Sequence, residues 1–251
     1  MKNIDLKNYE LDLFIKDLEE LNITLDEKQL CQFMKYYELL VEWNQVMNLT
    51  AITDINDVLK KHFIDSLSLV KAYDDFSSKS MIDISIIDIG TGAGFPGIPL
   101  KIAFPELKIT LLDSLNKRVN FLNMVIDELE LENIEAIHGR AEDFSKSGML
   151  REKFDLCVSR AVANLSTLSE YCLPYVKVGG KFISYKSGKI TEEIDNAEKA
   201  IFILGGKIDN QVEFMIPDSD IYRNLLVISK TKKTSEKYPR KAGVPAKNPI
   251  I

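Results

Sequence analysis

The chain has 251 residues, of which 45% are hydrophobic and 28% charged, and its formal net charge is −6. These values are typical of a globular protein and exclude a disordered chain, a collagen-like repeat and a disulfide-rich miniprotein. The longest uncharged stretch, 89–100, is shorter than the roughly 18 apolar residues of a membrane span, and the N-terminus lacks the apolar core of a secretory signal. We therefore expect a cytoplasmic protein without membrane contact.

Cysteine usage points away from structural cross-links. Cys31, Cys157 and Cys172 lie far apart in the sequence, and none belongs to a CxxC pair. Neither a disulfide framework nor a zinc site is expected from this spacing, and we expect no bound metal.

The first part of the chain, residues 1–78, is predicted to be a helical region. Apolar residues recur at three- and four-residue spacing over 6–21. Asp26 is expected to cap a second helix whose apolar face includes Phe33 and Tyr37, and Asn56 or Asp57 to begin a third. The polar stretch 72–80 indicates a linker.

The pattern then changes to alternating strands and helices. Short β-branched runs over 85–89, 109–112, 134–138, 154–159 and 181–185 are separated by helical stretches over 99–104, 117–129 and 165–175, with a further helix over 192–204. Such alternation predicts a parallel sheet covered by helices on both faces.

The final two predicted strands break this alternation. They span 207–214 and 224–229 with no helix between them, so they should pair antiparallel. We expect an α/β, Rossmann-like class I methyltransferase fold, with a mostly parallel seven-stranded sheet and an antiparallel last strand, over residues 79–231. A basic C-terminal tail, 232–251, follows.

A glycine-rich loop, 88-DIGTGAGFPG-97, joins the first predicted strand to a helix. Glycines there allow a tight turn and a close approach to a ligand. Gly92, Gly94 and Gly97 also satisfy the G-x-G-x-x-G pattern of nicotinamide enzymes. However, Asp88 before the glycines gives the D-x-G-x-G-x-G arrangement of S-adenosylmethionine (SAM) enzymes, and a carboxylate suits the cationic SAM better than a pyrophosphate.

Further acids follow the next strands. Asp113, at the end of the second strand, could accept both ribose hydroxyls of either cofactor, and Glu142 and Asp143 after the third strand could border an adenine. Each of these acids could instead cap a helix N-terminus.

The residues also limit the choice of methyl acceptor. No Pro-Cys pair supplies the nucleophile for cytosine C5, and the end of the fourth strand reads Ser159-Arg160-Ala161 where adenine methyltransferases have an Asn/Asp-Pro-Pro-aromatic turn. A ring nitrogen with a free lone pair, such as guanine N7, requires neither a nucleophile nor a general base. Positioning and electrostatics would then suffice, with Arg160 as the positioning group and no general base.

The chain resembles the bacterial 16S ribosomal RNA guanine-N7 methyltransferases, the RsmG/GidB family, nearly from end to end. The glycine loop alone indicates only SAM dependence, and more specific segments carry the resemblance. These are 43-WN-44, 48-NLT-50, 62-HFIDSL-67, 113-DSLNKR-118, 159-SRAVA-163 and 238-YPRKAGVP-245.

The resemblance implies methylation of one guanosine at N7 in the decoding-region loop of small-subunit rRNA. The substrate would be the RNA, the small subunit or an assembly intermediate, and we expect a monomeric enzyme. The implied SAM-site residues are Gly90, Phe95, Asp113, Ala141, Glu142 and Arg160, with Gly92 and Gly94 shaping the loop.

Basic residues near this site are candidate RNA contacts. Lys117 and Arg118 begin the helix after the second strand, whereas Lys186 is placed after the fifth strand and Arg223 before the seventh. Arg160 could alternatively pair with Glu142 or Asp143. A solvated surface position is the competing interpretation for the other four.

Seven of the residues over 230–247 are Lys or Arg, against the single acid Glu236. This charge favours an RNA contact through residues such as Arg240 and Lys241, and the prolines and glycines favour a tail that orders on binding. His62 and Asp65 share a helix face and are expected to dock the helical region, and Trp43 is expected to pack at that interface. Two other functions remain open: a nicotinamide-dependent oxidoreductase, and an RNA-binding factor with a SAM pocket but no catalysis.

Overall fold

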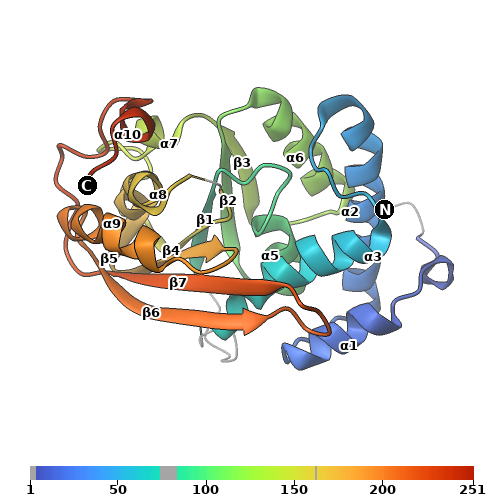
Figure 1. Cartoon of the computed structure of the whole chain (residues 1–251). Coiled ribbons are helices and arrows are strands. Elements are labelled where there is room, and N and C mark those ends of the chain that lie inside the picture. The colour runs from blue at the N-terminus through green and yellow to red at the C-terminus, as the bar shows by residue number, and fades with distance from the viewer. Residues whose placement is uncertain (1–3, 74–83, 162) are drawn as a thin grey trace.

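A seven-stranded sheet forms the centre of the molecule in a computed structural model, which describes residues 4–73, 84–161 and 163–251 (Figure 1). The strands are β1 (Ser85–Ile89), β2 (Lys108–Asp113), β3 (Ile134–His138), β4 (Phe154–Ser159), β5 (Val176–Lys186), β6 (Gly206–Met215) and β7 (Tyr222–Lys230). Their order in the sheet is β3-β2-β1-β4-β5-β7-β6. The pairings among β1–β5 are parallel, and β7 runs antiparallel to both β5 and β6. The predicted sheet is confirmed.

Helices cover both faces of the sheet. They are α1 (Asp12–Glu20), α2 (Glu27–Met47), α3 (Ile55–Val58), α4 (Asp65–Leu67), α5 (Gly97–Ala103), α6 (Asn116–Glu128), α7 (Ala141–Phe144), α8 (Leu165–Cys172), α9 (Thr191–Ile203) and α10 (Val244–Lys247). A π-helical segment, η2 (Leu59–Ile64), joins α3 to α4. Short 3-10 turns complete the helical elements: η1 (Leu6–Asn8), η3 (Ser68–Lys71) and η6 (Leu173–Tyr175).

The N-terminal helices differ from the prediction at their starts. The helix expected over 6–21 is divided into η1, whose N-cap Asp5 accepts a hydrogen bond from the Lys7 amide, and α1; Tyr9, at the end of η1, is extended. Asp26 caps α2 in a capping box with Gln29, as predicted. The third helix is capped by Asp54, rather than starting at Asn56 or Asp57. The expected boundary at residue 78, and most of the expected linker, lie outside the described residues.

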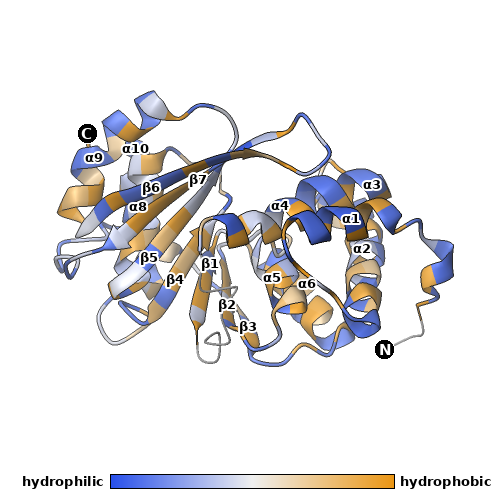
Figure 2. Cartoon of the chain, turned by 90° about the horizontal axis from the view of Figure 1, so that it is seen from below, coloured by the Kyte–Doolittle hydropathy of each residue, from blue (hydrophilic) through white to orange (hydrophobic). Residues whose placement is uncertain are grey.

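Alternation along the strands divides the core into two layers. Successive strand residues face opposite sides of a sheet, so Ile86 packs into the cluster with α1–α6 and Ile87 into the cluster with α8 and α9. Figure 2 shows this arrangement, with apolar strands enclosed between helices whose polar faces turn outward. The N-terminal region therefore shares one core with the sheet.

Aromatic side chains connect the N-terminal region to the sheet layer. Phe63 of η2 lies 5.0 Å from Phe33 and 5.4 Å from Tyr36, measured between ring centroids. Trp43 packs against Phe121 of α6 at 5.9 Å, as expected for an interface residue. Tyr36 is completely buried, whereas Tyr37, which was expected on this face, is only half-buried. These contacts fix α2 against η2 and α6.

The C-terminal tail is docked on the protein, so the expectation of a tail that orders on RNA binding is wrong. Arg151 donates to the carbonyls of Thr234, Ser235 and Tyr238. Arg240 forms an ion pair with Glu170 of α8, whose carboxylate is fully buried. Hydrogen bonds to buried charged groups are stronger than those between neutral groups, so they stabilise the docked tail relative to a free one.

Candidate active site

A cavity of about 400 Å³ lies at the carboxyl ends of β1 and β4, where the strand order reverses. Such a reversal is where open α/β sheets bind ligands, and this volume falls within the usual range for ligand pockets. The loops after β1, β2, β3 and β4 line the cavity, together with α8 and residues of the C-terminal tail. Gly90, Ala141 and Glu142 are the predicted cofactor residues that line it.

The glycine loop adopts backbone angles that few residues other than glycine adopt. Gly90, Gly92 and Gly94 have φ values of 70°, 63° and 104°, in the left-handed region. A Cβ added to Gly94 would lie 2.5 Å from Ile98 Cδ1 and 2.8 Å from Tyr36 Oη, whereas one on Gly92 would meet nothing within 4 Å. Gly94 therefore permits close packing inside the protein, and Gly92 only permits the turn.

Tyr36 braces this loop from the N-terminal region. Its hydroxyl donates a 2.5 Å hydrogen bond to the carbonyl of Ala93. Sequence reasoning missed this contact, because helical spacing shows that a residue is buried but not which distant carbonyl its hydroxyl meets.

Asp88 lies beneath the glycine loop and not in the cavity wall. One carboxyl oxygen accepts hydrogen bonds from Thr91 Oγ1 at 2.7 Å and from the Gly97 amide at 3.0 Å. The other oxygen is buried without a partner. Burial raises the pKa of Asp88 to about 7, although both hydrogen bonds favour the charged form. Its structural role is thus to hold the loop closed.

Asp113 also holds the loop. Its Oδ2 accepts from the Gly92 amide at 2.9 Å, and its Oδ1 accepts from the Leu115 amide at 2.9 Å. The second bond is a local turn two residues long that ends at Leu115, the N-cap of α6; α6 has no side-chain cap, so Asp113 does not play the alternative helix-capping role. The neighbouring residue Ser114 lines the cavity.

Ala141 and Glu142 begin α7, a helix that the sequence did not predict. The carbonyl of Ala141 accepts a 2.6 Å hydrogen bond from Tyr175 Oη. Glu142 is buried, and its Oε1 accepts from the amide of Gly243 at 2.8 Å. The C-terminal tail therefore contacts a predicted cofactor residue directly.

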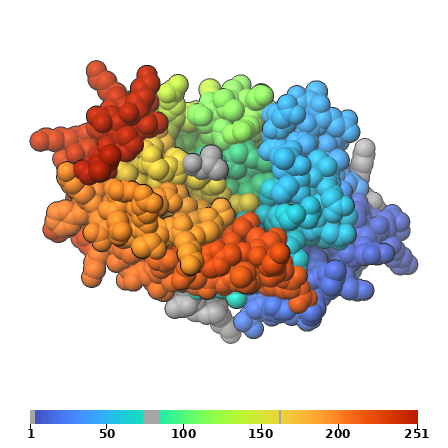
Figure 3. All heavy atoms as spheres, in the orientation of Figure 1, coloured from blue at the N-terminus to red at the C-terminus, as the bar shows by residue number. Residues whose placement is uncertain are grey.

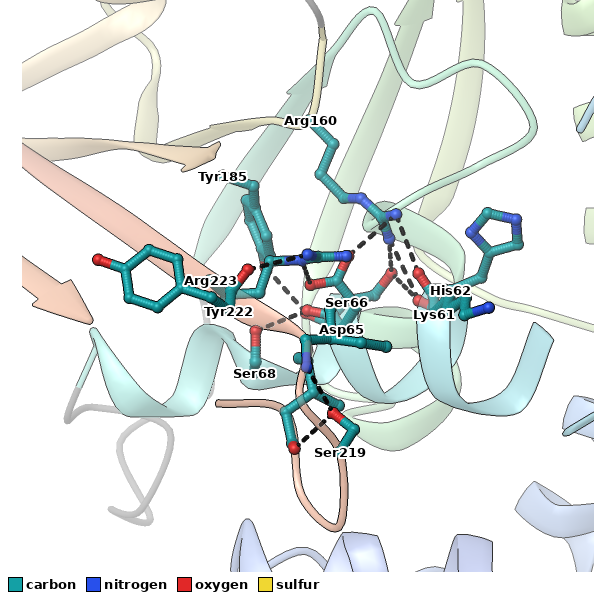
Figure 4. A network of polar contacts seen from close by, with 12 residues as sticks. Lys61, His62, Asp65, Ser66, Ser68, Arg160, Tyr185, Ser219, Tyr222 and Arg223 are labelled. Atoms are coloured by element: carbon teal, nitrogen blue, oxygen red, sulfur yellow. Dashed lines mark hydrogen bonds and ion pairs between the residues drawn. The ribbon is translucent and has the colours of Figure 1, made fainter. Parts of the chain in front are cut away.

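Arg160, at the end of β4, points toward the N-terminal helices (Figure 4). Its guanidinium lies 3.1 Å from Asp65 Oδ2 and donates to Ser66 Oγ and to the carbonyls of Lys61 and His62. The partner of Arg160 is thus Asp65, and not Glu142 or Asp143. Arg223 donates to the other oxygen of Asp65 at 2.7 Å. Asp65 docks the helical region onto the sheet, as expected, and it does so by pairing with Arg160 and Arg223.

Phe95 of the glycine loop lies between His62 and Arg160. The His62 ring stacks on it at 4.6 Å, and the Arg160 guanidinium lies 5.6 Å from its centroid. His62 Nε2 is 2.8 Å from Thr50 Oγ1. Burial, with a smaller effect from Arg160, lowers the pKa of His62 to about 4. A neutral imidazole therefore packs against the loop at neutral pH.

Two predicted RNA contacts lie within strands and not beside them. Lys186 is the last residue of β5, where it pairs with Glu193 at 2.6 Å, and Arg223 is the second residue of β7. Both line a second cavity, of about 130 Å³, with Asp65 and Arg160. Three cations and one carboxylate line this second cavity; Lys186 is paired with Glu193, which does not line it, so the excess positive charge lies on Arg160 and Arg223, which share Asp65.

The remaining basic candidates divide into exposed and paired residues. Lys117 and Lys241 are exposed, and Arg118 lies 3.5 Å from Asp113. Arg240 is committed to Glu170 through its backbone amide and its guanidinium. Of the two tail residues named as RNA contacts, Arg240 and Lys241, only Lys241 is exposed.

Known proteins are similar to this chain over nearly its whole length. Residues 29–222 match the family model described as "GidB: rRNA small subunit methyltransferase G". A protein named ribosomal RNA small subunit methyltransferase G from Lachnoclostridium phytofermentans is 56% identical, covering 95% of this chain and 96% of the relative. A relative of the same name from Acetivibrio thermocellus is 52% identical over 95% of this chain and 96% of its own.

The chain belongs to the rRNA small subunit methyltransferase G family. It is a SAM-dependent methyltransferase, as predicted, and the oxidoreductase alternative is excluded. A methyltransferase structure from Pyrococcus furiosus has the same fold, with a TM-score of 0.52 at 14% identity, covering 78% of this chain and 95% of that one. Within the described ranges, no helix is long and apolar enough to cross a membrane. No group of three or more His, Cys, Asp or Glu residues among them could hold a metal ion.

Proposed function

We propose that this chain methylates N7 of a single guanosine in the decoding-region loop of 16S rRNA, within the small ribosomal subunit or an assembly intermediate. The names of the relatives support a small-subunit rRNA substrate. The observation that carries the choice of N7 is that the described groups beside Arg160 offer no free general base.

The acids around Arg160 hold the structure through hydrogen bonds and ion pairs, and the histidine is a weak base, because burial lowers the pKa of His62 to about 4 and its Nδ1 is enclosed without a partner. Asp65 is paired with two arginines, Asp88 is sealed beneath the loop, and His62 is hydrogen-bonded to Thr50 and stacked on Phe95. An acceptor that must lose a proton would need one of these groups as a base. Guanine N7 carries a free lone pair, so it forms the new carbon–nitrogen bond without releasing a proton.

We assign the larger cavity to SAM, which supplies an electrophilic methyl group on its sulfonium. Gly90, Ala141 and Glu142 would line the cofactor site, and Asp113 would hold the Gly92 amide in place. Asp88 and Gly94 would preserve the loop, while Phe95 and Arg160 would border the acceptor. Positioning of the acceptor by such pre-ordered groups supplies the main catalytic effect in this mechanism.

We assign the second cavity to an RNA phosphate. Arg160 and Arg223 line it and share one carboxylate, Asp65, so one positive charge remains, while the third cation, Lys186, is paired with Glu193. Guanidinium groups already oriented by a carboxylate bind phosphate with little loss of side-chain entropy. Lys117, Arg118, Arg240 and Lys241 are further proposed RNA contacts, of which the solvent-exposed lysines have the freest side chains.

The test uses small subunits from cells lacking this enzyme, incubated with the purified protein and methyl-labelled SAM. Nucleoside mass spectrometry should detect new 7-methylguanosine at one rRNA position. Arg160→Lys, which keeps the charge but loses the planar fork, should lower the methylation rate by about tenfold or more while SAM still binds. Methylation at another atom would contradict the proposal, and SAM binding without any methylation would favour the non-catalytic RNA-binding alternative.

A further inference from the structure

The C-terminal tail forms part of the wall of the larger cavity. Gly243 and Ala246 line it together with Gly90, Ala141 and Glu142, although more than 90 residues separate these two groups in the sequence. The tail lies against α7 and α8 in the ribbon and space-filling views (Figures 1 and 3). A segment that the sequence assigned to RNA binding alone therefore lines the cavity that we assign to SAM.

Buried polar groups anchor this segment on both sides of the cavity wall. Arg240 makes hydrogen bonds of 2.6–3.1 Å with the fully buried carboxylate of Glu170. Between the two wall residues, Thr167 Oγ1 donates to the Pro245 carbonyl at 3.0 Å, and beyond them Ser166 Oγ donates to the Ile250 carbonyl at 2.5 Å. Charge-assisted hydrogen bonds at a buried acid are strong, so the segment is held in one position.

Gly243 acts directly on a cavity side chain. Its amide donates to Glu142 Oε1 at 2.8 Å, and its φ of 81° turns that amide toward α7. Glu142 is only 5% exposed, so the direction of its carboxylate depends on the hydrogen bonds it accepts.

We infer that residues 239–247 are a built-in wall of the SAM site, with Gly243 as the positioning residue that orients Glu142 toward the nucleoside part of SAM. The inference rests on the assignment of this cavity to SAM. It gives the tail a role in cofactor affinity that is separate from the exposed charge of Lys241 and Lys247.

The experiment measures SAM affinity by isothermal titration calorimetry on three variants and the full chain. A chain ending at Lys241 keeps the Arg240–Glu170 pair but removes the wall. Gly243→Pro keeps the length, but it removes the amide hydrogen and cannot adopt the φ of 81°, so it breaks the hydrogen bond to Glu142 and displaces the wall. Gly243→Ala keeps that hydrogen, and its added Cβ would meet nothing within 4 Å.

The shortened chain and Gly243→Pro should each raise the Kd for SAM by about tenfold or more, the equivalent of one well-formed interaction. Gly243→Ala should stay within about threefold of the full chain, because only its backbone angle is disfavoured. If the shortened chain does not fold, the two full-length variants decide. Equal affinity for Gly243→Pro and Gly243→Ala would overturn the inference.

Two further variants separate this inference from the cavity assignment. The variant Lys237→Ala removes an exposed tail charge outside residues 239–247 and should leave the Kd for SAM unchanged, which shows that the effect does not arise from the charge of the tail. Ala161→Phe would fill the cavity from the loop after β4, without changing the tail. If it leaves SAM binding intact, the assignment of the cavity is wrong. If it abolishes binding while Gly243→Pro does not, only the role of the tail is wrong.

Discussion

Asp65 Oδ2 lies 3.1 Å from the guanidinium of Arg160, although the two residues belong to the N-terminal helices and to the end of β4. Asp65 also binds Arg223 of β7 through its other oxygen, at 2.7 Å. The carboxylate is 3% exposed and each arginine 18%. One acid therefore joins the helical region, the centre of the sheet and its antiparallel end at the proposed site of methyl transfer.

Removing the charge of Asp65 should destabilise the protein. Asp65→Asn leaves two partly buried arginines without their counter-charge, and we expect it to lower the free energy of unfolding by about 2 to 4 kcal/mol. The matched control is Asp57→Asn, which breaks an exposed ion pair with Lys61 and should change it by less than about 0.5 kcal/mol. Urea unfolding of both variants gives the comparison, and equal effects would show that the Asp65 network contributes no special stability.

Two glycines of the same loop should differ in their tolerance of alanine. Gly94→Ala places a Cβ against Ile98 and the hydrogen-bonded hydroxyl of Tyr36, so we expect it to cost about 2 to 3 kcal/mol of unfolding free energy. Gly92→Ala meets no neighbour within 4 Å and should cost about 1 kcal/mol from its backbone angle alone. Thermal and urea unfolding measure both, and a larger loss at Gly92 would contradict this account of the loop.

The imidazole of His62 should remain neutral until the pH falls to about 4, because burial disfavours its charged form. Its folded pKa is below the unfolded value of 6.5, so its contribution to stability is complete above that value and is lost as the pH falls toward 4. The loss should be at most about 3 kcal/mol. A histidine NMR titration checks the pKa, with His138→Gln leaving His62 as the sole histidine, and a midpoint near 6.5 would refute the prediction.

Asp88 should have the opposite effect on the pH dependence of stability between about pH 4 and pH 7. Its folded pKa of about 7 is above its usual value of 3.8, so the folded state loses stability relative to the unfolded state as the pH rises between these two values. Asp88→Asn removes this titration, and the variant should therefore gain stability relative to the original chain as the pH rises from about 4 to about 7. Unfolding free energies of both chains at several pH values give the measurement; a pH-independent difference would be the contrary result.

The two tail residues proposed to contact RNA should respond differently to mutation. Lys241→Ala should reduce the salt dependence of RNA binding by about one unit of slope, since it removes an exposed cation. Arg240→Gln should mainly lower stability, since it leaves the buried Glu170 carboxylate unpaired. Binding measured between low and moderate salt, alongside urea unfolding, separates the two effects. An unchanged slope for Lys241→Ala would remove this lysine from the RNA interface.

The sequence by itself determined the layered sheet, the antiparallel end and the glycine loop. These features depend on local periodicity and on backbone angles that few residues other than glycine adopt, and both can be read within short segments. The capping box at Asp26 is of the same kind, since it involves residues three positions apart. Recognition of the family also came from short contiguous motifs.

Only the tertiary structure decided which charged groups meet. Asp65 and Arg223 are separated by 158 positions, and Glu142 and Gly243 by 101, so no local pattern records either contact. Asp88 and Arg240 show the same limit. Their residue types suggested a cofactor contact for Asp88 and an RNA contact for Arg240. In the fold, Asp88 lies beneath a loop and Arg240 pairs with a buried acid. The physical reason is that a buried charge is stable only beside a partner, and chain folding, not sequence distance, determines which partner is near.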